Sequence, residues 1–474
     1  MSTHALPAAR SLLTVRCRAA RALALAAVAA LAACGGDEPP ATRAPAAPRE
    51  EPPADARAAR PAAPRRALWV LAEGSQRVLE HAPRIDALLD DAEALGARDL
   101  FVQVYRGGRA WYDATLADAA PFRAAVAANG VDPLARLLAR AHERGVRVHA
   151  WVNVLSLSQN AEAPIVQALG RDAVLVDRRG RSLLDYPGYE VPEPDRSWYR
   201  MGTPGLYLDP AAPGVRERIV ATFGELLARY PALDGLHLDY IRHPGVLPFV
   251  PGSRFGVGLD FGYGEGSRAR FQRETGLTAP SAANMVNLER WDAWRREQVT
   301  ALVAAIAADA RARAPSIEVS AAVIPYADRA YLTLAQDWRR WLEDGLLDFA
   351  VPMIYTLDDR LFRYQAEHFA HVAGGDDGRD ARSADGRDGR VWAGVGVWLF
   401  ARAPERARAQ LAIARDAGLV DAALFSYDAM KEPGGEALLA ALAAPPAEAS
   451  AAAASAPPAA AATDGADGAD DGRR

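Results

Sequence analysis

Asp234-Gly-Leu-His-Leu-Asp-Tyr-Ile-Arg-His-Pro244 carries the strongest indication of the fold in this sequence. Its short apolar run predicts a buried strand over Leu236 to Tyr240, with the carboxylate of Asp239 and the guanidinium of Arg242 at its C-terminal end. In (β/α)8 barrels the chemistry lies at the C-terminal ends of the strands. An acid in this position, midway through the chain, therefore indicates a barrel enzyme.

Strand-like and helix-like segments alternate on both sides of this stretch. We predict eight strands at residues 67–71, 99–104, 147–152, 235–240, 317–322, 349–354, 391–397 and 422–426. We predict helices between and after them at 83–94, 132–145, 215–230, 291–312, 337–343, 361–372, 405–417 and 435–442. The strands are apolar without alternation, as expected of parallel strands buried on both faces. The pattern predicts a (β/α)8 TIM barrel with long loops at its C-terminal face. A doubly wound sheet is the alternative, and no glycine-rich fingerprint follows the first strand to favour it.

Composition excludes some classes of protein. The 474 residues carry a formal net charge of -5, which gives no electrostatic basis for binding nucleic acid. The two cysteines, Cys17 and Cys34, have no further Cys or His around them. The sequence therefore predicts neither a zinc motif nor a cofactor.

The N-terminus has the order of features found in a targeting segment. Arginines at 10, 16, 18 and 21 precede an apolar stretch, Ala22 to Ala33, that is too short to span a membrane as a stable helix. It ends in Leu31-Ala32-Ala33-Cys34-Gly35, which resembles a bacterial lipobox. We predict a signal peptide over 1–33 and lipidation of Cys34, with an outer-membrane anchor facing the periplasm. An ordinary signal peptide that ends near a Cys is the alternative.

Three further segments lack apolar periodicity. Residues 34–65 are rich in Pro, Ala and Arg, and we expect a disordered tether between the lipid and a domain over 66–442. We expect a disordered insertion at 374–390 and a disordered tail at 443–474. Two longer insertions, 153–208 and 243–267, follow the third and fourth strands. The first contains a predicted hairpin, 173–177 with 182–185, and both could build the walls of a cleft.

Polar and aromatic residues gather at the predicted strand ends. They include Gln103, Tyr105, Arg106, Trp111, Trp151, Asn153, Tyr240, Arg242, Tyr355, Trp398 and Asp428. Aromatic faces stack on sugar rings, while amides and carboxylates bind hydroxyl groups. The set therefore indicates a glycan-binding cleft, although Trp151 and Trp69 fit a packed barrel interior equally well.

Glycoside hydrolysis needs two carboxyl groups flanking the bond. Asp239 is the best candidate, as nucleophile or base, because an Arg242 partner would keep it ionised. A structural Asp239 paired with Arg242 is the alternative. For the proton donor we favour Glu73, since a partly buried Glu is readily kept protonated. Asp113, Asp358 and Asp428 remain open. His237 and Asp239 share one face of their strand, but no second ligand pair completes a metal site.

At these residues the chain resembles the glycosyl-hydrolase-like family 10 proteins, over roughly residues 66 to 430. Six motifs occur in family order: Arg66-Ala67-Leu68-Trp69-Val70, Val102-Gln103-Val104-Tyr105-Arg106, His149-Ala150-Trp151-Val152-Asn153, Leu208-Asp209-Pro210, Asp234 to Pro244, and Val351-Pro352-Met353-Ile354-Tyr355. The resemblance implies a TIM barrel acting on glycans. Its best-understood type is a divisome-associated outer-membrane lipoprotein that cleaves peptidoglycan glycan strands lacking stem peptides.

The chain departs from the family pattern at two places. It has Pro352-Met353 where Pro-Gln is common, and Gly107-Gly108-Arg109-Ala110 where Gly-Asp-Ala often follows the Arg. We expect a glycoside hydrolase of a bacterial envelope polysaccharide, with division or envelope proteins as possible partners. A non-catalytic glycan-binding lipoprotein and a metal-dependent polysaccharide deacetylase are the competing hypotheses.

Overall fold

The computed structural model describes residues 64–248, 259–281, 283–374 and 390–443. The predicted signal peptide, Cys34, nearly all of the tether, residues 375–389 of the insertion and all but the first residue of the tail lie outside these ranges. Among the described residues no helix is both long and apolar enough to cross a membrane.

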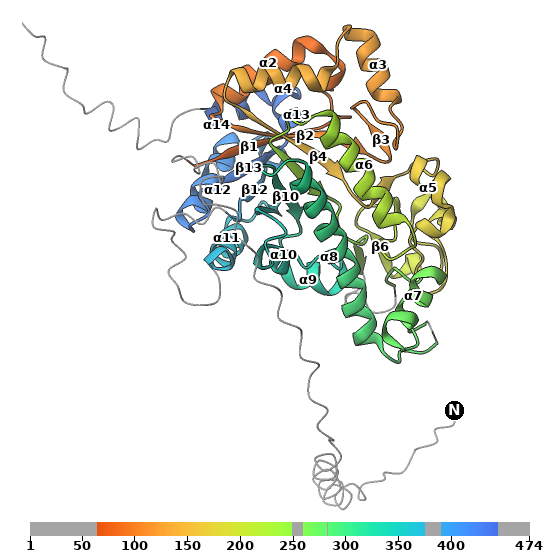
Figure 1. Ribbon diagram of the computed structural model, residues 1–474. Helices are drawn as coiled ribbons and strands as arrows, with labels where there is room; N and C mark the ends of the chain where they lie inside the picture. The colour runs from red at the N-terminus through yellow and green to blue at the C-terminus, as the bar shows by residue number, and fades with distance from the viewer. Residues whose placement is uncertain (1–63, 249–258, 282, 375–389, 444–474) are drawn as a thin grey trace, which may run out of the picture. The chain divides into compact units, whose positions relative to one another are not determined.

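Eight parallel strands form a closed barrel, as predicted (Figure 1). They are β1 (Arg66–Val70), β2 (Asp99–Arg106), β4 (Arg147–Asn153), β8 (Gly235–Asp239), β10 (Glu318–Val323), β11 (Phe349–Ile354), β12 (Ala393–Gly396) and β13 (Ala422–Phe425). Each strand pairs with its neighbour along the chain, and β1 pairs with both β2 and β13. This double pairing closes the sheet, so the doubly wound alternative is excluded.

Each predicted helix is present within a few residues of its expected ends. The observed helices are α2 (Ala82–Ala94), α4 (Pro133–Glu143), α6 (Val215–Arg229), α8 (Leu288–Arg313), α10 (Trp338–Glu343), α11 (Asp359–Gly374), α12 (Pro404–Asp416) and α14 (Glu436–Ala443). Sequence periodicity missed α3 (Ala120–Asn129), α5 (Pro164–Leu169), α7 (Glu265–Thr275), α9 (Ala327–Thr333) and α13 (Tyr427–Lys431). Apart from α3, these are short helices or helices in the loops between strands, where local patterns are weak.

The insertion after β4 contains only short elements. β5 (Ser156–Ser158) pairs with β7 (Leu206–Tyr207), and β6 (Tyr199–Met201) pairs with β9 (Val246–Pro248) from the next insertion. The predicted hairpin is reduced to one antiparallel bridge, Val176 with Ser182, because residues 183–185 form a 3-10 turn. The β6–β9 pairing joins the two insertions, as expected for walls on one side of the barrel.

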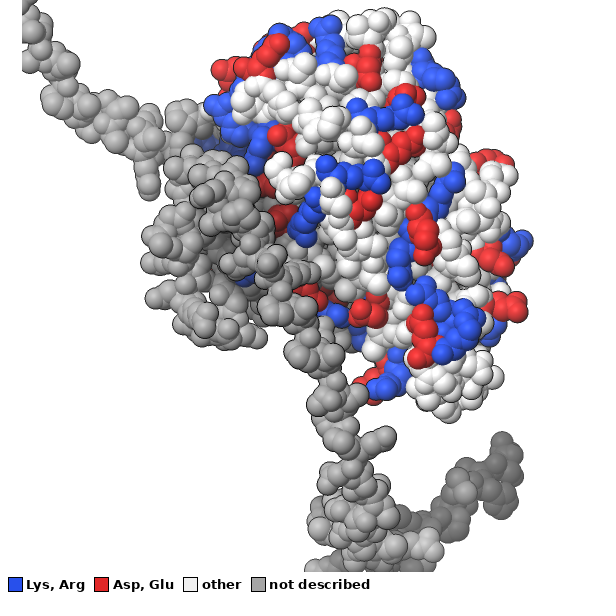
Figure 2. Space-filling model, in the orientation of Figure 1, with Lys and Arg blue, Asp and Glu red and all other residues white. Residues whose placement is uncertain are grey.

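Basic and acidic side chains are interspersed over the face of the molecule seen in Figure 2. Several of the helices pair charges of opposite sign, as Arg229 on α6 does with Asp113 and as Arg313 does with Asp309 on α8. Such exposed pairs each contribute little to stability, so the fold depends mainly on the buried layers between helices and barrel.

Aromatic side chains fill the barrel interior. Phe101 stacks on His237 at 4.1 Å between ring centroids, and Phe349 stacks on Trp392 at 4.2 Å. Trp69 contacts the edge of Phe101. The interior is therefore a packed core, and any ligand must bind above it at the strand ends.

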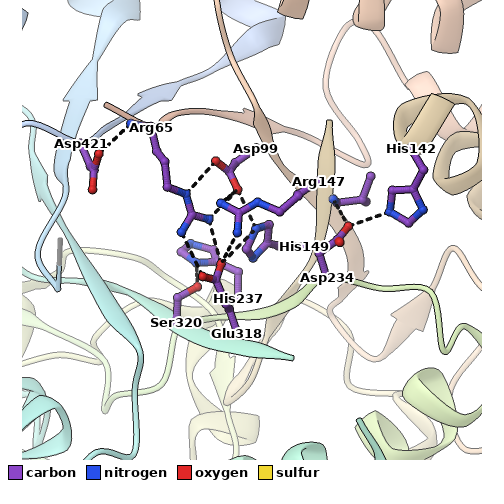
Figure 3. A network of polar contacts seen from close by, with 11 residues as sticks. Arg65, Asp99, His142, Arg147, His149, Asp234, His237, Glu318, Ser320 and Asp421 are labelled. Carbon is purple, nitrogen blue, oxygen red and sulfur yellow. Dashed lines mark hydrogen bonds and ion pairs between the residues drawn. The ribbon is translucent and has the colours of Figure 1, made fainter. Parts of the chain in front are cut away.

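The N-terminal ends of the strands are closed by an ion network (Figure 3). Arg65 donates to Asp99 through Nη2 at 2.7 Å and to Glu318 through Nη2 at 2.8 Å, and its guanidinium lies over the Trp392 ring at 4.5 Å. Arg147 lies 2.8 Å from the same Asp99 oxygen. Arg65 was expected at the end of the tether, but it is buried in the barrel floor.

Candidate active site

Asp239 ends β8 at the mouth of the barrel, as the sequence predicts. It is 7% exposed and both of its oxygens accept hydrogen bonds. The indole Nε1 of Trp151 donates to Oδ2 at 3.1 Å, and the backbone N of Tyr240 donates to Oδ1 at 2.7 Å. These two donors hold the carboxyl group in one orientation, which a reacting group requires.

Burial raises the pKa of Asp239 above its ordinary value of 3.8, against the opposing effects of the Tyr240 backbone N–H, the Arg242 charge and the Trp151 indole. The expected ion pair with Arg242 is absent: no oxygen of Asp239 lies within 4.0 Å of a guanidinium nitrogen in the described residues. Arg242 instead lies over the Tyr240 ring, 4.9 Å from its centroid. The premise that Arg242 keeps Asp239 ionised is therefore not met, and desolvation dominates.

The backbone turns sharply after Asp239. Tyr240 has a φ of 51°, in the left-handed region that a bulky residue rarely adopts. Its ring lies 6.2 Å from that of Tyr207 on β7. Burial and the nearby Asp239 carboxylate raise the pKa of Tyr240 to about 12. Strained residues of this kind cluster at functional sites, where surrounding packing maintains them. Tyr207 comes from the insertion, and no sequence pattern identified it.

Below Asp239 three side chains linked by hydrogen bonds cross the barrel interior. Trp69 Nε1 donates to His237 Nε2 at 3.0 Å, and His237 Nδ1 lies 2.9 Å from Ser320 Oγ. Burial lowers the pKa of His237 well below 6.5, so the ring is neutral and Nδ1 carries the proton. Both nitrogens are used, which leaves no lone pair of His237 for a metal ion.

Glu73 lies in the loop after β1 and is paired with two arginines. Arg109 lies 2.6 Å from Oε1 and Arg106 lies 3.5 Å from Oε2. Glu73 is therefore surrounded by charged groups and lacks the apolar surroundings expected of a proton donor. Arg106, predicted to bind sugar, is partly committed to this pair.

Two predicted polar residues are placed close to the site by hydrogen bonds. Gln103 donates to Asn153 Oδ1 at 3.2 Å and accepts from the backbone N of Ala72. Asn153 is paired across the sheet with Asp239.

Asp428, by contrast, accepts from the backbone N of Leu71 and of Gln76. Its contacts therefore support the loop after β1, which is a structural role.

Tyr355 and Trp398 form an aromatic surface beside Asp239. Tyr355 stacks on Phe425 at 5.6 Å, and its hydroxyl group is buried without a partner among the described residues. Burial, followed by the charge of Asp239, raises the pKa of Tyr355 well above 10. Gly396 separates Tyr355 from Trp398, which is 48% exposed. A Cβ atom at Gly396 would lie within 3.3 Å of both rings, so a glycine keeps this surface open.

Tyr105 and Trp111 were predicted to bind sugar, and their positions contradict this. The register between β2 and β4 shifts between Gln103 and Tyr105, which turns Tyr105 outward to contact the edge of Phe223 on α6. Trp111 is 1% exposed and lies in the layer between barrel and helices. Neither ring offers a face to a ligand.

The alternative loop acids are engaged in contacts of their own. Asp113 is exposed and forms an ion pair with Arg229 on α6. Asp358 accepts from the backbone N of Arg360 and Leu361 at the start of α11. Both carboxylates therefore stabilise helices or loops.

Asp99, His149 and Glu318 each offer a ligand atom within 4.8 Å of the others, in the geometry of a metal site. Arg65 and Arg147 already contact the carboxylate oxygens of this cluster. Two fixed positive charges supply what a cation would supply and would repel one. We therefore assign the cluster to closure of the barrel floor (Figure 3).

Comparisons with known proteins agree with this architecture. Residues 64–371 match the family described as glycosyl hydrolase-like 10. The glycosyl hydrolase DigH of Escherichia coli is 28% identical over 284 residues, which are 56% of this chain and 56% of DigH. The glycosyl hydrolase YngK of Bacillus subtilis is 25% identical over 285 residues, 56% of this chain and 48% of YngK. The chain thus aligns with about half the length of these curated relatives.

Among solved structures, the glycoside hydrolase domain of PgaB (BpsB) from Bordetella bronchiseptica superposes with a TM-score of 0.55. The superposition covers 80% of this chain and 99% of that domain, at 16% sequence identity. At this identity the likeness concerns the fold alone.

Proposed function

Because this chain belongs to the glycosyl hydrolase-like 10 family, we propose that it hydrolyses glycosidic bonds of a bacterial envelope polysaccharide. The substrate we propose is the peptidoglycan glycan strand lacking stem peptides. The observation that carries the proposal is Asp239, a buried and doubly hydrogen-bonded carboxyl group at the C-terminal end of a barrel strand. Aromatic rings beside it, Tyr240, Tyr355 and Trp398, supply the faces on which sugars stack.

The surroundings of the two carboxyl groups favour an exchange of the roles that the sequence suggested. Burial raises the pKa of Asp239, so we assign it the transfer of a proton to the glycosidic oxygen. Glu73 forms ion pairs with Arg106 and Arg109, and we assign it the base or nucleophile. The C–O bond on the leaving side breaks as that oxygen takes the proton, and water supplies the hydroxyl group that forms at the anomeric carbon.

Trp151 and Gln103 act as positioning residues in this scheme. Trp151 orients the carboxyl group of Asp239, and Gln103 links Asn153 to the loop that carries Glu73. We further propose that Cys34 is lipidated and anchors the barrel to the outer membrane, facing the periplasm. Basic residues, an apolar run and small residues before a Cys support this.

A second candidate function is glycan binding without catalysis. The observation that favours it is the double ion pair of Glu73, which commits one of the two carboxyl groups proposed to be catalytic. Binding would use the same aromatic surface and would need no second carboxylate.

The two functions differ in their products. The full chain is incubated with stem-stripped glycan and with intact sacculi, beside Asp239→Asn, and soluble products are identified by mass spectrometry. Release from stripped glycan that Asp239→Asn abolishes supports the hydrolase. A folded protein that pellets with glycan and releases nothing supports the binding function.

A further inference from the structure

A groove with a volume of about 860 Å³ lies outside the barrel, and Asp239 is not among its lining residues. Its walls are the segment after β10, α9, α10 and α11, and β11 separates α10 from α11 along the chain (Figure 1). A second hollow of about 640 Å³ shares Leu361 and Tyr364 with the first. The two hollows therefore meet along α11, on either side of these two side chains.

Tyrosine rings line the groove and are unusually exposed. Tyr364 is 73% exposed, Tyr326 is 43% and Tyr331 is 41%. The guanidinium of Arg296 lies 4.0 Å from the centroid of the Tyr331 ring. Three half-exposed aromatic rings in one groove offer flat apolar faces bordered by polar groups, which is the arrangement that sugar rings require.

Two lining residues carry hydrogen-bond donors without a partner. Gln336 is 1% exposed, and its Oε1 accepts from the backbone N of Ile324 at 2.8 Å, while its Nε2 has no partner among the described residues. Trp338 is equally buried and its Nε1 is also unpartnered in the described part of the chain. Buried donors that lack an acceptor are rare and costly. Both atoms are enclosed by protein, so they add polarity beneath the groove surface and do not themselves contact a ligand in this conformation.

The charges of the groove are mixed. Asp328, Asp337 and Glu343 face two arginines, Arg339 and Arg340, and Arg340 is paired with Glu297 and Asp344 outside the groove. Burial lowers the pKa of His368, so this lining residue is neutral at pH 7. Stem-stripped glycan bears a lactyl carboxylate on alternate sugars, so the arginines can pair with these carboxylates while the acids accept hydrogen bonds from its hydroxyl groups.

The groove adjoins the neighbourhood of Asp239 through α9. The backbone N of His243, in the loop after β8, donates to the carbonyl of Leu334 just after α9 at 2.9 Å. Arg329 on α9 is close enough to Arg242 that the two charges repel. These contacts place the segment after α9 beside the loop that follows Asp239 and its strand.

We propose that the α9–α11 groove binds a distal part of the same glycan chain whose reacting bond lies at Asp239. This inference rests on the proposed substrate class, and it makes the protein selective for long chains. Tyr364 is the central contact because its side chain borders both hollows.

The test measures binding of the full chain carrying Asp239→Asn, so that hydrolysis does not interfere. Four proteins are compared by co-sedimentation with stem-stripped glycan: this parent, and the parent with Tyr364→Ala, with Tyr364→Phe or with Val286→Ala. Val286 is 59% exposed outside the groove and serves as the surface control. Circular dichroism melting checks that every variant is folded. A disaccharide from the same glycan serves as a short competitor.

We expect Tyr364→Ala to weaken binding of the long glycan roughly three- to tenfold, the loss expected for one aromatic contact. Tyr364→Phe and Val286→Ala should bind like the parent, and the affinity for the disaccharide should not depend on the groove. Equal binding by parent and Tyr364→Ala overturns the groove proposal alone. A parent that does not bind glycan overturns both proposals. Groove-dependent binding without any hydrolysis by the wild type overturns the hydrolase and leaves the groove in place.

Discussion

Arg65 joins the ends of three strands at the barrel floor, so its removal should destabilise the whole barrel. Its guanidinium makes four hydrogen bonds, two to Asp99 at 3.1 and 2.7 Å and two to Glu318 at 3.0 and 2.8 Å. Its backbone N donates to Asp421 at 2.7 Å. The substitution Arg65→Met keeps an unbranched, though shorter, side chain and removes the charge and its hydrogen bonds.

The size of the effect depends on the charges that Arg65→Met leaves behind. Removing one partner of a buried ion pair costs about 3–5 kcal/mol, because the other charge stays buried without compensation. Asp99 is fully buried, but Arg147 still lies 2.8 Å from its Oδ1. We therefore expect the lower end, a loss of ~3 kcal/mol in the free energy of unfolding. With an unfolding entropy of roughly 0.7 kcal/mol per kelvin for a barrel of this size, the Tm falls by about 4 °C.

Calorimetry of the full chain measures this change, with Arg65→Met/Asp99→Asn as the matched variant. Neutralising Asp99 removes the buried charge that Arg65→Met leaves with one partner fewer, so the double variant should recover part of the lost Tm. An unchanged Tm in Arg65→Met would show that the ion network does not hold the floor together. A double variant less stable than Arg65→Met would show that the buried charge of Asp99 is not the cause of the loss.

Four further predictions concern Asp239 and two glycines. Asp239→Asn should lower kcat at least about a thousandfold, and product release measured by mass spectrometry checks it. If Asp239 donates the proton, activity falls as pH rises through its raised pKa, and a pH–rate profile that instead rises there would assign it as the base. Because the pKa of Asp239 is raised in the folded form, Asp239 keeps its proton to a higher pH in the folded than in the unfolded protein. The free energy of unfolding of the wild type should therefore fall, relative to that of Asp239→Asn, as pH increases from 3.8 upward. Melting curves at several pH values test this. Gly74→Ala places a Cβ against Asp428 Oδ1, closer than real Cβ atoms approach, so it should lower the free energy of unfolding by about 1–3 kcal/mol, measured by calorimetry. Gly434→Ala is the comparison: it has open space around it but a φ of 88°, so it tests the cost of backbone strain alone.

Much of the architecture could be predicted from local sequence. Short apolar runs such as Leu236 to Tyr240 are buried on both faces only in a parallel sheet covered by helices, and the alternation with helices predicts the barrel. The same local pattern places Asp239 at the C-terminal end of its strand, since the position of a residue within a strand follows from the chain itself.

Contacts between distant segments could not be predicted in this way. The register shift that turns Tyr105 away from the barrel depends on the pairing of β2 with β4. The pairing of Glu73 with Arg109, and the absence of an ion pair between Asp239 and Arg242, depend on how loops fold back on one another. Tyr207 lies beside Tyr240 because an insertion packs on the strand ends.

Burial patterns within single segments were therefore enough to specify the order of strands and helices, the barrel and the position of Asp239. The folded molecule was needed to show which carboxyl group is desolvated, which is held by arginines, and that Arg65 belongs to the barrel floor. Protonation and ion pairing depend on the burial and the charges that surround a group in space, and those come from residues far apart in the chain.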